Sequence, residues 1–286
     1  MNTYYTQELR QHVGRALAAF EPHDAGLATM PADLLALRDR LRTVEQLAAS
    51  PAEVEPEHTA ADRLGADLAD SAGGVEQGLE VAVGGLQALR TERADAELRR
   101  GLVDKARAVT ASRLVDAVRD RADLLITEHL APAQADTIKK VRTAAAAFAP
   151  FGSNMKHLLT APKAARDAFI GVDEQLARYT ALRAARGRLV ALSGEQQLDE
   201  WGYFTEVRNT EVIWPEIAGQ GRPNPSTAPW PTSGREHLLY LAGPEIEPWC
   251  PTVAQQNDRW REVFGERLRR AQENRQQLQG FAAVFG

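Results

Sequence analysis

The chain has 286 residues, of which 44% are hydrophobic and 26% charged, and its formal net charge is −5 at pH 7. A single cysteine excludes a disulfide scaffold and any Cys-based zinc or iron–sulfur site within one chain. No run of apolar residues approaches the roughly 18 that would suggest a transmembrane helix, and the first residues lack the pattern of a secretory signal. We therefore expect a cytoplasmic or particle (virion)-associated protein without a membrane partner.

Helical spacing begins near residue 33. Between residues 33 and 48, apolar residues recur at alternating intervals of three and four, as they do on one face of an amphipathic helix: Leu34, Leu37, Leu41, Val44 and Ala48. Prolines at positions 31 and 51 flank this segment, and proline is common at helix boundaries. The pattern predicts a helix over residues 33–48.

The longest predicted helix covers about residues 59–130, which contain no proline. Apolar and small residues follow helical spacing from Leu64 to Leu89, and the stripe resumes from Leu98 to Leu125. At about 1.5 Å per residue, a continuous helix of this length would measure roughly 100 Å. That is the dimension of a spacer or scaffold.

Glycine residues oppose a continuous helix in this segment. Gly73-Gly74 and Gly84-Gly85 lie within it, and each glycine costs about 1 kcal/mol relative to alanine in a helix interior. Two interpretations stay open. The glycines allow a neighbouring helix to approach the backbone closely, or they divide the segment into two or three shorter helices.

Prolines and capping patterns place the next boundaries. Pro132 and residues 150–154 bound a helix whose apolar face holds Ile138, Val141, Ala145 and Phe148. Thr160-Ala161-Pro162 opens a helix that runs to about Leu192, and Ser193-Gly194-Glu195-Gln196 has the pattern of a capping box that starts the next one. We expect antiparallel helices joined by short loops.

The composition changes after residue 193. All five tryptophans lie in the last 86 residues, and eight of the fifteen prolines lie between Pro215 and Pro251. Because prolines remove hydrogen-bond donors and favour extended backbone, residues 222–231 cannot be a helix. We expect an ordered segment laid over helices and anchored by tryptophan rings. A Ser233 cap predicts a short helix at 237–241, and Thr252-Val-Ala-Gln255 predicts a capped final helix.

Together these patterns predict an all-α fold. An elongated, coiled-coil-like helical hairpin or bundle occupies residues 1–192. A Pro/Trp-rich C-terminal subdomain occupies residues 193–286 and is closed by a helix at about 252–279.

Sequence motifs for catalysis, metal binding or phosphate binding are weak. The one Glu-x-x-His pattern, at residues 55–58, contains a proline and has no second pair, so we predict no metal site and no cofactor. No phosphate-binding loop of the GxxxxGK[ST] type occurs. Cys250 has only His237 near it in sequence as a candidate base. An enzyme of unknown class with a site near His237 and Cys250 is the weakest of three functional alternatives.

Charge is distributed unevenly along the chain. Residues 137–190 carry a net charge of +7, which leaves −12 for the rest. Such a segment can bind an anionic partner or the acidic part of a second copy. The candidate partner-binding residues in it are Lys139, Lys140, Arg142, Lys156, Lys163 and Arg166. Nucleic-acid binding through residues 137–190 stays an alternative, although no aromatic residues are interleaved on the basic helices.

The last seven residues are apolar after a very polar segment. Phe281, Val284 and Phe285 should be covered by the protein's own core or, by preference, by another subunit. These features lead to the hypothesis of a non-enzymatic structural or assembly protein that acts through protein–protein contacts, including self-association. A capsid-associated virion protein of a phage of GC-rich bacteria is one setting for it, by analogy of composition alone.

Overall fold

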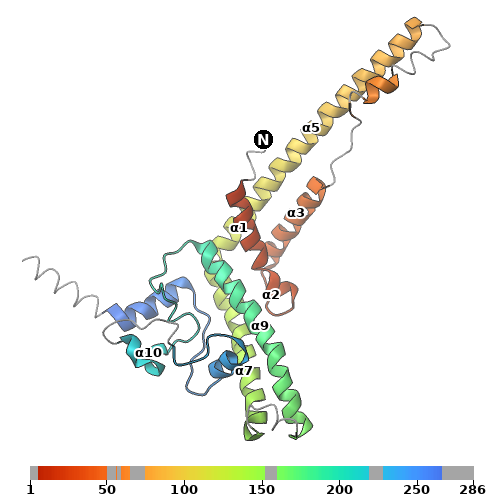
Figure 1. The fold of residues 1–286 in the computed structure, drawn as a ribbon. Helices are drawn as coiled ribbons and strands as arrows, with labels where there is room; N and C mark the ends of the chain where they lie inside the picture. Colours follow the sequence, from red (N-terminus) through yellow and green to blue (C-terminus); the bar gives the residue numbers. More distant parts are fainter. Residues whose placement is uncertain are drawn as a thin grey trace, which may run out of the picture. The chain divides into compact units, whose positions relative to one another are not determined.

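The computed structural model describes residues 6–49, 56, 59–64, 75–151, 160–218 and 228–265. In these ranges the chain is helical apart from turns and irregular segments, and the one β-type contact among them is an isolated antiparallel bridge between Val207 and Pro248. The predicted all-α fold is confirmed (Figure 1). None of the helices in the described ranges is long and apolar enough to cross a membrane.

The helices pack as two units, which we describe separately. The first unit holds the described residues of 1–13 and 32–115, and the second holds those of 14–31 and 116–286. The predicted boundary at residues 192–193 lies within the second unit, and this division of the chain stays a prediction.

The first unit contains α3, Ala32–Ala49, which confirms the helix predicted over residues 33–48. Leu34 and Leu41 of the predicted apolar face are fully buried. A further helical segment covers residues 59–64, and α1, Gln7–Ala18, begins in this unit.

The longest helix is α5, Val75–Asp120, whose residues up to 115 belong to the first unit. Gly84 and Gly85 lie inside it without ending it. A Cβ atom at Gly85 would lie 3.1 Å from Cδ2 of Leu64, which is closer than ordinary van der Waals contact. At Gly85 the absence of a side chain therefore allows Leu64 to approach the helix backbone closely, and the glycine does not break the helix. Gly73-Gly74 lies outside the described residues.

The long helix ends ten residues earlier than predicted. Arg121 leaves helical geometry, with φ −112° and ψ 11°, before the short α6, Ala122–Leu124. Pro132 lies in the first turn of α7, Ala131–Phe148, which confirms the helix start predicted there, and a π-helical turn over Leu125–Leu130 leads directly into this helix. A proline ring crowds the carbonyl group of the preceding α-helical turn, and the wider π turn before Pro132 leaves it more room.

In the second unit, α7 packs along α9, Lys163–Ser193 (Figure 1). The apolar face predicted for α7 meets an apolar face of α9 in one core, and the rings of Phe148 and Phe169 pack edge to face with centroids 5.2 Å apart. Buried members of the two faces are Ile138, Val141, Phe148, Phe169, Tyr179, Leu182 and Leu189.

The capping box predicted at residues 193–196 is wrong. Ser193 is the last residue of α9, and Gly194 follows it with φ 69° in the left-handed conformation that ends many helices. Glycine adopts this conformation without the steric cost that other residues carry, so Gly194 makes the serine a helix end instead of a helix start.

Short elements and aromatic packing form the remainder of the second unit. The aromatic cluster consists of Tyr203, Phe204, Trp214, Trp260 and Phe264, with Trp230 and Trp249 packed against it. Trp230 also stacks on Tyr240, with ring centroids 5.5 Å apart, so a tryptophan anchors the end of the proline-rich segment as expected. The remaining elements of this unit are α2 (Glu21–Asp24), η2 (Ala149–Phe151), α10 (Thr210–Ile213), η3 (Pro215–Ala218), α11 (Gly234–Leu241) and a helix at 253–265.

The predicted cap at Thr252 is confirmed. The backbone N–H of Gln255 donates to Oγ1 of Thr252 at 3.2 Å, and the N–H of Thr252 donates to Oε1 of Gln255 at 3.0 Å. The helix that follows is described to residue 265, so its predicted end near 279 lies outside the described residues. At α11, Ser233 holds the N-cap position without a side-chain hydrogen bond, and the helix begins three residues earlier than predicted.

Candidate functional site

The predicted basic partner-binding residues lie on α7 and α9. Lys139 and Lys140 are exposed on α7, and Lys163 and Arg166 are exposed on the first turn of α9. Nζ of Lys140 lies 2.8 Å from Asp136, and Nζ of Lys163 lies 2.6 Å from Asp167, each one helical turn away. Exposed pairs of this kind add little stability. Lys156, Phe281, Val284 and Phe285 lie outside the described residues.

Arg142 has an internal structural role. Its Nε donates to the carbonyl oxygen of Ala242 at 3.1 Å, and its Nη2 donates to those of Gly243 at 3.3 Å and Ile246 at 3.2 Å. Ala242 directly follows α11, where unsatisfied carbonyl groups and the helix dipole both attract a cation. Arg142 thus fastens the end of α11 to α7. Whether it also contacts a partner stays a prediction.

Arginines of α9 tie segments of the second unit together. Arg178 donates to the carbonyl oxygen of Leu27, and Arg188 donates to that of Ala18 and pairs with Glu21. Much of the positive charge that stood out in residues 137–190 is therefore directed at carbonyl and carboxylate oxygens of the same unit. The sequence gives no sign of these pairings, because their partners lie about 150 to 170 positions away.

A buried polar cluster joins α9, α11 and the loop between them. The Tyr179 hydroxyl donates to Oε1 of Glu206 at 2.7 Å, and Nε of Arg183 lies 2.9 Å from the same oxygen. His237 lies on the other side of this carboxylate, with Nε2 3.3 Å from Oε2. Burial by itself would raise the pKa of Glu206. The facing His237, Tyr179 and Arg183 together lower it by more, so the pKa of Glu206 lies below its ordinary value.

A second buried chain of polar groups centres on Gln256. Arg186 donates from Nη2 to Oε1 of Gln256 at 2.8 Å, and Nε2 of Gln256 donates to Asp199 at 2.8 Å. Asp199 also accepts the backbone N–H groups of Tyr203 and Phe204 at 2.9 and 2.8 Å. All three side chains are nearly fully buried, and the amide connects a buried cation to a buried anion.

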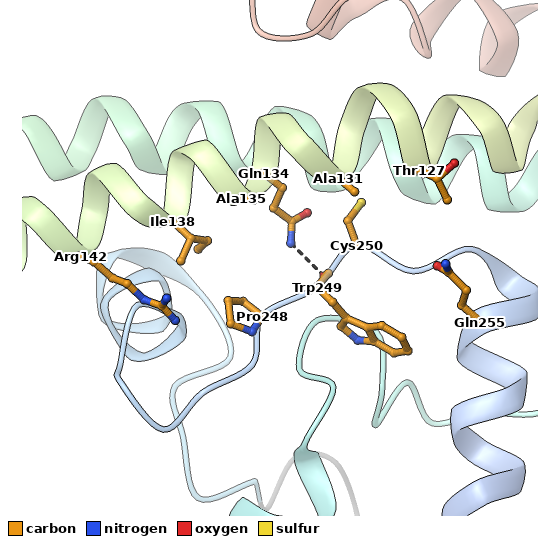
Figure 2. A pocket seen from close by; sticks show the side chains of 10 residues that line it. All are labelled: Thr127, Ala131, Gln134, Ala135, Ile138, Arg142, Pro248, Trp249, Cys250 and Gln255. Carbon is orange, nitrogen blue, oxygen red and sulfur yellow. Dashed lines mark hydrogen bonds between the residues drawn. The ribbon is translucent and has the colours of Figure 1, made fainter.

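A pocket of about 470 Å³ lies where the segment around Trp249 crosses α7 (Figure 2). Gln134 donates from Nε2 to the carbonyl oxygen of Trp249 at 3.0 Å, which fixes this segment on the helix (Figure 2). Cys250 also lines the pocket, whereas His237 is not among its lining residues. Burial raises the pKa of the Cys250 thiol to about 11.

The geometry gives no support to catalysis by a Cys250–His237 pair. A cysteine nucleophile needs a lowered pKa and a base within hydrogen-bond reach. Cys250 has a raised pKa, and both nitrogens of His237 face other groups, the carbonyl of Pro231 and the carboxylate of Glu206. Among the described residues, no group of three or more His, Cys, Asp or Glu side chains is arranged to hold a metal ion.

The part of α5 in the first unit exposes three apolar side chains on one side of the helix, and the exposed Lys105 lies on the same side between two of them. Leu98, Leu102 and Val109 are 64%, 59% and 42% exposed. At about 100° per residue, their spacing of four and seven places them within about 40° on one side of the helix. On the opposite side, Leu89, Ala111 and Leu114 are buried, whereas Arg100, between them in sequence, is exposed. We call Leu98, Leu102 and Val109 the α5 outer face.

Comparison with known proteins adds no relative. No family model, no curated protein and no solved structure matches the chain.

Proposed function

We propose that the chain is a non-enzymatic assembly protein that acts through protein–protein contacts, and that the α5 outer face is one of its contact surfaces. The observation that carries this proposal is the exposure of Leu98, Leu102 and Val109 on a single side of α5. Single exposed apolar residues are ordinary on protein surfaces. Three that share one side of a helix favour a contact on that side.

The arginine contacts favour protein contacts over the nucleic-acid alternative. A phosphate-binding surface needs several cationic side chains directed at the solvent. In the segment 137–190, Arg142 donates to three backbone carbonyls and Arg186 is buried against Pro251 and Gln256. The basic side chains exposed on α7 and α9 stay candidates for a second contact surface, as do Phe281, Val284 and Phe285.

A more specific proposal concerns the particle in which this protein assembles. A phage virion of a GC-rich host fits the arginine-rich, alanine-rich composition, and no residue contact bears on it. Co-sedimentation of the chain with particles from its native source would support this setting. Recovery of the chain only in the soluble fraction would remove it.

Site-specific crosslinking tests the contact surface. A photoreactive amino acid replaces Leu102 in the full chain, and a matched variant carries it at Glu97, an exposed α5 position about 100° around the helix from Leu98. After illumination in the native extract, we expect a protein adduct from position 102 and little from position 97. Equal yields from both positions, or no adduct from 102, would contradict the proposal.

A further inference from the structure

The pocket beside Trp249 has walls from two parts of the second unit. Ala131, Ala135 and Ile138 line it from α7, and Pro248 and Trp249 line it from the crossing segment (Figure 2). Its volume of about 470 Å³ falls within the roughly 300–1,000 Å³ of pockets that hold small molecules. The two alanines have small side chains, so this stretch of α7 leaves room between the helix and the segment.

Hydrogen bonds fix the crossing segment that forms one wall. The carbonyl oxygen of Trp249 accepts from Nε2 of Gln134, and the backbone N–H of Trp249 donates to the carbonyl oxygen of Glu206 at 3.1 Å. The indole Nε1 donates to the carbonyl oxygen of Phe204 at 2.9 Å. The half-buried ring of Trp249 is thus held in place before any ligand arrives, and a preformed pocket loses little entropy when it binds one.

Gln134 presents an unpaired hydrogen-bond acceptor in this pocket. The residue is only 4% exposed, and its Nε2 is bonded to Trp249. Its Oε1 accepts no hydrogen bond from any residue that the structure describes, yet this atom is not sealed from the pocket. Buried polar groups in proteins are normally paired. A ligand that donates an N–H or O–H group fits this position.

Arg142 is the one charged side chain among the ten residues that line the pocket. Its Nε and Nη2 donate to three backbone carbonyls, whereas its Nη1 donates to none of the described residues. The carbonyls are neutral, so they fix the guanidinium group without cancelling its charge. Glu245 and Glu247 of the nearby loop are exposed and do not line the pocket. The Arg142 end of the pocket therefore attracts an anion.

The donors in the pocket favour a carboxylate over a phosphate group. Phosphate sites combine several cationic side chains or backbone N–H groups, whereas this pocket offers a single guanidinium nitrogen. A carboxylate has one negative charge, which one arginine can match. Trp249 and Ile138 supply an apolar wall against which a flat ring packs well.

We propose that this pocket binds a small aromatic carboxylate. The carboxylate group contacts Nη1 of Arg142, the ring packs against Trp249, and an N–H or O–H group of the ligand donates to Oε1 of Gln134. This site lies in the second unit, goes beyond the proposed assembly function and does not depend on it.

Ligand-detected NMR on the full chain at low salt tests the site with two probes. Indole-3-acetate has a flat ring, an N–H donor and a carboxylate, and indole-3-acetamide is its uncharged analogue. We expect indole-3-acetate to bind with a Kd of about 1 mM or lower. The amide should bind about tenfold more weakly, because it loses a charge-assisted hydrogen bond. No binding of indole-3-acetate up to about 10 mM, or equal affinities for the two probes, would overturn the inference.

Variants locate the bound probe. Ala135→Phe fills the pocket without removing a hydrogen bond, so indole-3-acetate should bind at least about tenfold more weakly. Ala147→Phe is the matched control, because Ala147 is exposed on α7 and does not line the pocket, and it should bind like wild type. Unchanged binding to Ala135→Phe, or an equal loss in both variants, would overturn the inference.

Arg142→Gln tests the contact with the carboxylate, after circular dichroism has shown that the variant is folded. It should bind the two probes with equal affinity, because the charge that separates them is gone. A folded Arg142→Gln variant that still prefers indole-3-acetate tenfold would contradict the inference. If this variant does not fold, the two probes on wild type and the Ala135→Phe comparison decide.

Discussion

Nε2 of His237 lies 3.3 Å from Oε2 of Glu206, and Nδ1 of the same ring lies 2.6 Å from the carbonyl oxygen of Pro231. A carbonyl oxygen only accepts hydrogen bonds, so Nδ1 carries a hydrogen. Nε2 faces the carboxylate within ion-pair distance but makes no hydrogen bond with it. The histidine thus links the end of the proline-rich segment to Glu206 and, through Tyr179, to α9.

Glu206 should give the second unit an acid-sensitive contribution to stability. Its pKa is lowered below the ordinary 4.5 in the folded protein. The stabilisation is therefore present above pH 4.5 and is lost as the pH falls through the lower folded-state pKa. We expect Glu206→Gln to reduce the free energy of unfolding by about 1–3 kcal/mol at pH 7, and by less at lower pH.

Urea unfolding at pH 7 and below pH 4.5 measures this difference. Glu195→Gln is the matched control, because Glu195 is exposed, and it should change stability by no more than about 0.5 kcal/mol. A Glu206→Gln deficit that stays constant over this pH range would show that the carboxylate charge is not what stabilises the fold.

Gln256→Ala should be among the most destabilising single changes in the second unit. It removes the amide between Arg186 and Asp199 and leaves both buried charges short of one partner. Hydrogen bonds to charged groups contribute about 1.5–3 kcal/mol each, so we expect a loss of about 3 kcal/mol or more in urea unfolding. The exposed Gln196, changed to Ala in the same way, should have little effect. Similar values for both variants would refute this role of Gln256.

A comparison of variants at Arg142 and Lys139 distinguishes a structural role from a partner-binding role within the basic segment. Arg142→Ala removes three hydrogen bonds to carbonyls after α11, and we expect a stability loss of about 2 kcal/mol. Lys139→Ala affects an exposed side chain and should leave the melting temperature unchanged. If Arg142→Ala melts like wild type and instead weakens association, Arg142 acts on a partner.

Cys250 should react slowly in the folded protein. Burial raises its pKa to about 11, so only about one thiol in a thousand is ionised at pH 8. The thiolate is the reactive form. At pH 8 we therefore expect alkylation of the denatured protein to be complete before alkylation of the folded protein can be measured. Mass spectrometry over time follows the reaction. Equal rates with and without denaturant would contradict the burial of this thiol.

Local sequence patterns determined the helices whose signals lie within a few residues. The three-and-four spacing placed α3, the Thr160-Ala161-Pro162 boundary placed the start of α9, and Thr252 with Gln255 placed the last helix. Helix periodicity and capping are interactions between residues one turn apart, so the sequence alone contains both partners of each contact. At Ser193-Gly194 the sequence fits both the start of a helix, through a serine cap, and the end of a helix, through a left-handed glycine. The predicted helix start was wrong there.

The tertiary structure alone decided what the polar residues do. Glu206 meets Tyr179 and His237, which lie 27 and 31 positions away, and Arg142 reaches carbonyls about 100 positions along the chain. A lysine or arginine on an amphipathic helix has the same pattern whether it faces solvent, a partner or a distant carbonyl. The same holds for Leu98 and Leu102, since the helical period fixes which residues share a side but not which side is covered. Burial depends on how helices from separate parts of the chain come together, and that information is absent from any local window of residues.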